Sequence, residues 1–315
     1  MINKSVLAFL CLCVFLVGAQ QAAPGRAQNP FLTPSQNTAE EQAESRRKPA
    51  TINPLLVRLN ALQRDFREHM TGYARQIQEK PTGGTTLRFL ALTFAFGVVH
   101  ALGPGHGKSI VCAYFLARRG TLRQALLFGN LITFMHVLSA TAVVFALALL
   151  GRKTNIFAFQ ELEGGLQPFS YLLIILIGSF LLLKAAKDIL ARRKPVSEQA
   201  RADADRTSMA ALSLSAGLIP CPGAALILLF TLSLDILWAG LAAMVVLAIG
   251  MGLTNSLVGI ITLGSRGAVM RLTSTSPRVF RTTYALFAVG GALFIVFLGT
   301  SLLLGSVGSA GARFF

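Results

Sequence analysis

Six long apolar segments constrain the fold of this chain more than any other feature of its sequence. They lie at about residues 87–117, 123–150, 168–190, 209–233, 236–263 and 281–305. Each is long enough to cross a hydrocarbon core of about 30 Å as an α-helix that rises about 1.5 Å per residue. Backbone polar groups in hydrocarbon must be satisfied within the segment, and helices achieve this. The sequence therefore predicts an all-α, polytopic membrane protein with six transmembrane helices.

Composition agrees with this prediction. The chain is 53% hydrophobic and only 13% charged, whereas soluble globular domains carry about 25% charged residues. The net charge of +16 is spread between the apolar segments. It lacks the basic face and the aromatic interleaving typical of nucleic-acid binders. We therefore expect a lipid bilayer and no nucleic acid as a partner.

The basic residues also predict an orientation. Among the connections between the apolar segments, basic residues concentrate after the first, third and fifth: Arg118, Arg119 and Arg123, then seven from Lys184 to Arg206, then Arg266, Arg271, Arg278 and Arg281. The opposite connections and the tail hold only Arg152, Lys153 and Arg313. Positive charge favours the cytoplasmic side. This pattern predicts a multi-pass protein of the plasma (inner) membrane whose mature N-terminus and C-terminus are both extracytoplasmic.

Residues 1–22 have the features of a secretory signal peptide. Lys4 precedes an apolar run from Val6 to Gly18, and small and polar residues follow it. The run is shorter than the roughly 20 residues that a membrane span needs. An uncleaved N-terminal hydrophobic helix is the alternative, and both place residues 23–86 outside the cytoplasm.

The extracytoplasmic segment 23–86 has two parts. Residues 23 to about 50 are polar and proline-rich, which predicts disorder. After them, apolar residues recur at helical spacing: Leu55, Leu59, Leu62, Phe66, Met70, Tyr73 and Ile77. This spacing predicts an amphipathic helix, with His69 on its surface. The helix can lie on the membrane surface or pack as a lid.

Two segments carry a similar proline–glycine interruption. These are "GVVHALGPGHG" from Gly97 and "GLIPCPGAA" from Gly217. They open the first helix of each half of a 3+3 arrangement: a first three-helix repeat at 87–190, a cytoplasmic loop at 191–208 and a second repeat at 209–315. Paired broken helices in inverted repeats indicate a transporter site near the midplane. Ordinary kinks are the alternative, because proline and glycine are tolerated in membrane helices.

Three histidines lie deep in the apolar segments. His100 and His106 are near the middle of the first segment, and His136 is near the middle of the second. Asp188 and Asp235 lie at segment ends, and the other acidic residues are assigned to loops or the N-terminal region. Imidazoles without carboxylates suit nickel, cobalt, zinc or copper ions and suit magnesium or calcium poorly. Hydrogen bonding between helices is the alternative role for each histidine.

The residues between the first two histidines predict a break that brings them together. In a continuous helix, His100 and His106 would be separated by about 9 Å of rise and about 120° of rotation. Pro104 cannot donate a backbone hydrogen bond, and its ring clashes with the preceding turn. Gly103 and Gly105 permit backbone angles that other residues avoid. We therefore predict a metal site formed by His100, His106 and the neighbouring His136.

Several other residues of the apolar segments keep open roles. Lys108 can be deprotonated, point toward the cytoplasmic end or bind an anionic substrate group. Asn255 can line a pathway or bond a neighbouring helix. Cys221, between Pro220 and Pro222, can be a soft ligand or a redox thiol, and a small buried hydrophobe is the favoured interpretation. We assign the two prolines to the helix break.

At these residues the chain resembles the nickel/cobalt efflux permeases, the NicO family of RcnA-type transporters. The matching stretches are "HALGPGHGKSIVCAYFLARRGTLRQAL" from His100, "HVLSATAVV" from His136, "AGLIPCPGAALILL" from Ala216 and "LNALQRDFREHM" from Leu59. The resemblance implies an ion-driven permease that moves Ni²⁺ or Co²⁺ out of the cytoplasm, with no permanently bound cofactor. Some members carry a histidine-rich loop between the third and fourth spans, but the loop here contains no histidine.

Two other functions compete with metal efflux. A thiol-redox transmembrane protein would use Cys112 and Cys221, which remain after Cys11 and Cys13 leave with the signal peptide. An exporter of a small organic solute would use Lys108 to bind an anionic group. We do not expect an enzyme, because the spans offer no carboxylate and no nucleophile–base pair.

Overall fold

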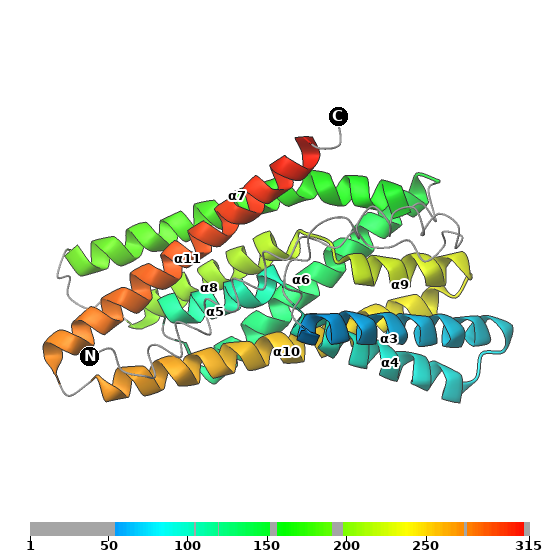
Figure 1. Ribbon diagram of the computed structural model, residues 1–315, viewed down its shortest axis with the longest axis horizontal. Coiled ribbons are helices and arrows are strands. Elements are labelled where there is room, and N and C mark those ends of the chain that lie inside the picture. The colour runs from blue at the N-terminus through cyan, green and yellow to red at the C-terminus, as the bar shows by residue number, and fades with distance from the viewer. Residues whose placement is uncertain are drawn as a thin grey trace.

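The computed structural model describes residues 54–103, 105–118, 120–151, 156–190, 198–273 and 276–311. The predicted signal peptide and the polar segment up to residue 53 lie outside this range, as do Pro104 and residues 191–197 of the predicted loop. The described residues form helices throughout (Figure 1): α3 (Pro54–Glu79), α4 (Gly83–Leu102), α5 (His106–Ala117), α6 (Leu122–Leu149), α7 (Ile156–Leu190), α8 (Glu198–Gly217), α9 (Pro222–Ser233), α10 (Leu237–Leu272) and α11 (Pro277–Gly311).

Five of the helices in the described part are long and apolar enough to cross a membrane. The apolar stretches are Gly83–Leu102, Leu122–Leu149, Ala158–Lys187, Leu237–Leu272 and Val279–Ser306. A sixth crossing results if Arg206–Gly217 and Pro222–Ser233 count as one span, which is bent by 58° at its break. The prediction of an all-α, polytopic membrane protein is confirmed.

Helix α7 differs from its prediction at its N-terminal end. The apolar segment was expected to begin at residue 168, but the helix begins at Ile156 and continues through Pro168. Glu161 and Glu163 therefore lie in a candidate membrane span, and the expectation that the spans hold no carboxylate is wrong. The Gln167 side chain donates a hydrogen bond to Glu163 Oε1 at 3.1 Å, which partly satisfies this half-buried carboxylate.

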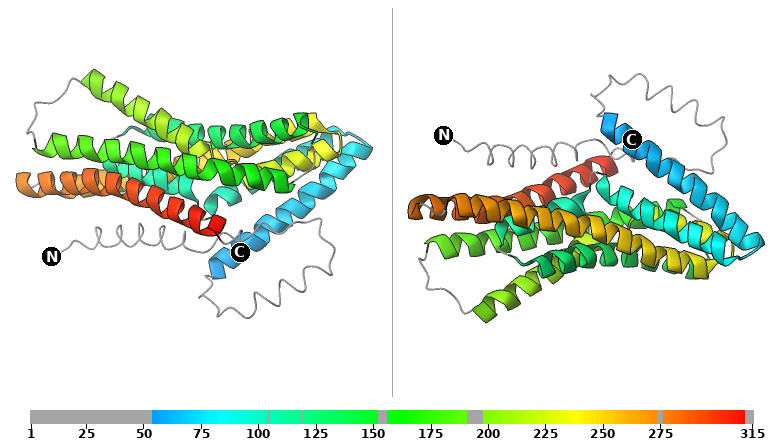
Figure 2. Two further views of the ribbon diagram at one scale, coloured as in Figure 1. Left: turned by 90° about the horizontal axis from the view of Figure 1, so that it is seen from above. Right: turned by 90° about the horizontal axis from the view of Figure 1, so that it is seen from below.

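Glycines allow the helices to approach closely around α10. A Cβ atom placed on Gly97 of α4 would lie 2.7 Å from the carbonyl oxygen of Leu247, and one on Gly250 of α10 would lie 2.5 Å from that of Phe94. Small residues at such contacts are typical of membrane helix pairs, because they let the backbones pack directly. Helices α7 and α11 pack in the same way, with Gly178 against Ile295 and Gly299 against Ile175. Figures 1 and 2 show these long helices running roughly along the length of the bundle.

The buried apolar side chains form two clusters. At each break, the helix before the break contributes side chains to one cluster and the helix after it contributes to the other. One cluster includes side chains from α3, α4, α9 and part of α10. The other includes side chains from α5, α8 and α11. Helices α6 and α7 contribute to both. The breaks between α4 and α5 and between α8 and α9 thus lie where one apolar cluster gives way to the next.

Helix α3 packs along α4 through its apolar face. Met70, Ala74 and Ile77 are buried, and the Thr93 hydroxyl of α4 contacts the sulfur of Met70 at 3.4 Å. Figure 2 shows α3 at an angle to the long helices, at the edge of the bundle. The amphipathic helix predicted from the spacing of apolar residues is present, and the lid alternative matches this packing.

Candidate functional site

The first break separates α4 from α5, as the sequence predicted. The backbone angles of the two glycines at this break differ from the expected ones. Gly103 has φ −60° and ψ 166°, and Gly105 has φ −168° and ψ 143°. Both are extended conformations that any residue adopts, so the expectation of unusual backbone angles is wrong. A Cβ atom on Gly103 would lie 3.5 Å from both Leu59 and Gln63 of α3. Glycine at this position provides room for the close approach of α3.

Lys108 is directed back toward the break. Its ammonium group donates a hydrogen bond to the carbonyl oxygen of Gly103. That carbonyl follows the last turn of α4 and has no partner within the α4 helix. The lysine therefore joins α5 to the end of α4. This contact does not match one of the three roles left open for Lys108, in which its side chain points toward the cytoplasmic end.

The second break lies against α6. Helix α8 ends at Gly217, Cys221 occupies the N-cap position of α9, and Pro222 is the first residue of α9. Proline suits this first position because it has no backbone N–H to leave unpaired. A Cβ atom on Gly217 would lie 3.1 Å from the backbone nitrogen of His136. The end of α8 therefore lies directly beside the histidine of the second span.

His106 and His136 form one pair of imidazoles. Their ring centroids are 5.7 Å apart, with the rings edge to face at 77°. The His106 ring also interacts electrostatically with the backbone of Ala216, near the end of α8. The Nδ1 atom of His136 is buried and has no hydrogen-bond partner. A ring nitrogen in this state is a free electron-pair donor when it carries no proton.

His100 is paired with Cys221. The Cys221 sulfur lies 3.6 Å from His100 Nε2, and the cysteine has no exposed surface. The thiol also interacts with the side chain of His136. The expectation that the spans hold no nucleophile–base pair is therefore wrong, because a thiol and an imidazole are in contact here. Sequence reasoning missed this contact because it connects helices 121 residues apart in the chain.

The histidines gather in one region as two pairs. Within the described part of the chain, no three His, Cys, Asp or Glu side chains are arranged to hold a metal ion. His106 is paired with His136, His100 is paired with Cys221, and an electrostatic interaction between Cys221 and His136 links the two pairs. A single ion shared by His100, His106 and His136 stays a prediction.

Asn255 bonds a neighbouring helix beside this region. Its Nδ2 donates to the hydroxyl of Thr133 on α6 at 3.1 Å, and Asn255 is buried. A Cβ atom on Gly107 would lie 3.9 Å from the same Asn255 nitrogen. Of its two open roles, the bond between helices is the one that the structure contains.

Two helix C-termini converge on the histidines. The last turn of α4 carries His100, and the last turn of α8 contacts His106 and approaches His136. Helix C-termini carry a partial negative charge of about half an elementary charge. Both therefore favour a cation at the breaks. The N-termini of α5 and α9 face the same region and act in the opposite direction.

Helix α3 adds a positive charge near the first break. Arg67 is half-buried, and its guanidinium acts electrostatically on His100. Burial lowers the pKa of Arg67 below its ordinary value, and Arg64 lowers it further. Arginine nevertheless stays charged in proteins.

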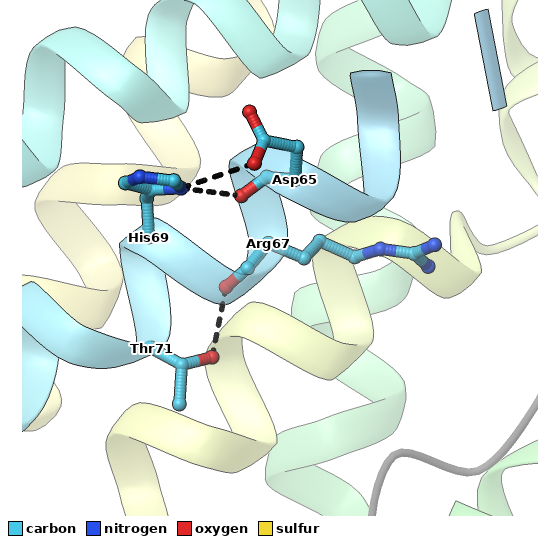
Figure 3. Close-up of polar contacts among 4 residues, drawn as sticks. All are labelled: Asp65, Arg67, His69 and Thr71. Atoms are coloured by element: carbon cyan, nitrogen blue, oxygen red, sulfur yellow. Dashed lines mark hydrogen bonds and ion pairs between the residues drawn. The ribbon is translucent and has the colours of Figure 1, made fainter. Parts of the chain in front are cut away.

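His69 lies away from the candidate site, as predicted. Its Nδ1 lies 2.9 Å from the backbone oxygen of Asp65 and 3.5 Å from the Asp65 carboxylate. The His69 side chain is 60% exposed. Figure 3 shows Arg67 extending away from His69 and Asp65, while Thr71 bonds to the Arg67 backbone. Glu68, His69 and Tyr73 line a shallow surface depression there.

These observations define a class of protein: a polytopic helical membrane protein with imidazoles and a thiol gathered at the breaks between α4 and α5 and between α8 and α9. Comparison with known sequences gives the family. The model of the NicO family, described as high-affinity nickel-transport protein, matches residues 86–211. A putative nickel/cobalt efflux system of Methanocaldococcus jannaschii is 33% identical over 168 residues, which cover 53% of this chain and 72% of that protein. The chain belongs to the NicO family.

Two further relatives extend the match. A putative nickel/cobalt efflux system of Haemophilus influenzae is 24% identical over 290 residues, which cover 79% of this chain and 88% of that protein. The nickel/cobalt efflux system RcnA of Escherichia coli (strain K12) is 26% identical over 234 residues, covering 61% and 82%. No solved structure matches the chain.

Proposed function

We propose that this protein is a permease that exports divalent transition-metal ions, nickel or cobalt, from the cytoplasm. Membership of the NicO family and relatives named as nickel/cobalt efflux systems support this proposal. The Ni²⁺ or Co²⁺ ion is the transported substrate, with no permanently bound cofactor.

The observation that carries the proposal is the gathering of three imidazoles where both broken helices meet α6. Imidazole nitrogens are good ligands for nickel and cobalt, whereas magnesium and calcium prefer oxygen ligands. The unpaired Nδ1 of His136 supports a ligand role, because buried polar atoms ordinarily have partners. We assign His100, His106 and His136 as the ligands. We assign to the helix breaks and the pathway Gly103, Pro104, Gly105, Lys108, Pro220, Cys221, Pro222 and Asn255.

The arrangement as two pairs suits an ion that passes through rather than one that stays. The ion is held first by one set of nitrogens and then by another, and no set forms a closed cage. The negative ends of α4 and α8 favour the cation and the positive ends of α5 and α9 oppose it, so the side-chain ligands offset most of the cost of an ion at membrane depth. Arg67, next to His100, weakens binding there and favours release.

The proposed architecture is a 3+3 inverted repeat in the inner membrane. Its halves begin with the two broken helices, and each break separates one apolar cluster from the other. The distribution of lysine and arginine between the connections supports extracytoplasmic termini. In this orientation α3 covers the outer side of the first break.

Metal accumulation in cells tests the proposal. Cells that lack their own nickel and cobalt exporters, and that express the wild-type chain, are expected to contain less nickel or cobalt than cells with an empty vector. The His106→Ala variant is expected to lose this effect. His69→Ala is the matched control, since it removes an imidazole that is 60% exposed and outside the candidate site, and it should behave as wild type. If the wild-type chain changes the content of neither metal, the proposal is wrong.

A further inference from the structure

Cys221 occupies an unusual position for a buried thiol. It is fully buried, contacts the imidazole of His100, interacts electrostatically with that of His136 and occupies the N-cap position of α9. A cysteine that served only as a small apolar side chain would need none of these contacts. The partial positive charge at the start of α9 stabilises negative charge on the sulfur, as a metal-bound thiolate requires.

The spacing of the sulfur and the His100 nitrogen matches that of two ligands on one ion. Tetrahedral sites have metal–sulfur bonds of about 2.3 Å and metal–nitrogen bonds of about 2.0–2.1 Å. At a tetrahedral angle these bonds place the two ligand atoms about 3.6 Å apart. The Cys221 sulfur and His100 Nε2 are 3.6 Å apart. A hydrogen bond between the thiol and the imidazole already spans this distance, so the pair can accept an ion with little movement of either backbone.

A third ligand lies next to this pair. The His136 side chain interacts with the Cys221 thiol, and its buried Nδ1 has no hydrogen-bond partner. Among the described residues no three such groups already surround an ion, so His136 has to turn toward the pair. Rotation of a ring is a small change compared with movement of a helix.

We infer that Cys221 is a ligand of the transported ion, which it binds as a thiolate together with His100 and His136. This inference rests on the proposed function and adds a sulfur ligand from the second broken helix. On binding, the S–H bond breaks, a metal–sulfur bond forms and the proton passes to water, with no change of oxidation state. One proton is released from Cys221 for each ion bound. Thiolate ligation favours nickel, cobalt and zinc over magnesium and manganese.

Cobalt spectroscopy of the purified full-length protein tests this assignment. Titration with Co²⁺ is expected to produce a thiolate-to-cobalt charge-transfer band in the near ultraviolet, together with visible ligand-field bands. Cys221→Ser and Cys221→Ala should lose the charge-transfer band and weaken cobalt binding at least about tenfold. The matched control is Cys112→Ser, which changes the other buried cysteine of the described residues and should keep the band.

The outcomes separate this inference from the proposed function. A charge-transfer band that persists in both Cys221 variants would overturn the ligand assignment, and so would cobalt binding by the wild type without such a band. Folding is checked by size-exclusion chromatography and circular dichroism, and serine replaces the thiol with little change of shape. If cells export the metal but the wild-type protein shows no charge-transfer band, the proposed permease function stands and Cys221 is not a ligand. If the band is present but cells export no metal, Cys221 is a metal ligand and the proposed export function is wrong.

Discussion

Helices α4 and α10 pack closely at Gly97, and this contact contains none of the proposed ligands. Gly97 lies about one turn before His100 on α4, where its Cα faces the Leu247 carbonyl. A Cβ atom added at this position would lie 2.7 Å from that carbonyl oxygen, whereas ordinary contacts begin at 3.4 Å. A backbone carbonyl cannot rotate away as a flexible side chain can. Gly97→Ala therefore has to separate the two helices by about 0.7 Å.

A displacement of this size is large for a metal site. Ligand distances in such sites hold to within about 0.2 Å, and a misplacement of 1 Å can lower a rate about 100-fold. We expect Gly97→Ala to lower nickel or cobalt export between about 10-fold and 100-fold with all ligands still present. Gly250→Ala brings a Cβ atom to 2.5 Å from the Phe94 carbonyl and should have an equal or larger effect.

Metal content of expressing cells, normalised to the amount of protein in the membrane, measures the effect. The matched control is Gly264→Ala, also on α10, because a Cβ atom there meets nothing within 4 Å. All three changes gain about 1 kcal/mol of helix propensity, so a shared loss of glycine cannot explain a difference between them. Export by Gly97→Ala at the level of Gly264→Ala would refute the claim that the spacing of α4 and α10 sets the geometry of the site.

Three further predictions concern residues around the site. Arg266→Met removes a buried hydrogen bond to the backbone at the end of α5, which should lower the free energy of unfolding by about 1.5–3 kcal/mol. The melting temperature of the purified protein should fall, and an unchanged melting temperature would contradict this prediction. Asn255→Leu and Thr133→Val each break the same bond between α10 and α6, so each should cost about 1 kcal/mol and the double variant less than the sum of the two single effects; additive effects in thermal melts would show that the bond contributes nothing. Arg67→Gln removes a cation near His100 and should tighten cobalt binding by up to about fivefold, as measured by titration; weaker binding would show that Arg67 supports the site.

The sequence predicted most of the fold because the relevant physics is local. Hydrocarbon requires each spanning segment to be apolar and helical over its own length, so the six segments can be found without knowing their neighbours. Pro104 and the prolines beside Cys221 interrupt helices through their own covalent structure. Helix α7 departed from its prediction because Glu161 and Glu163 continue the helix beyond the apolar run.

The sequence by itself thus determined that this chain is a helical membrane protein with two interrupted spans and three histidines near the interruptions. Only the tertiary structure decided which groups touch: that Cys221 contacts His100, that Lys108 bonds to Gly103, and that α3 approaches closely over the first break. Such contacts depend on how helices cross and on their relative rotation. These are set by packing between residues far apart in the chain, including the glycine contacts along α10, and periodicity within one segment carries no information about them.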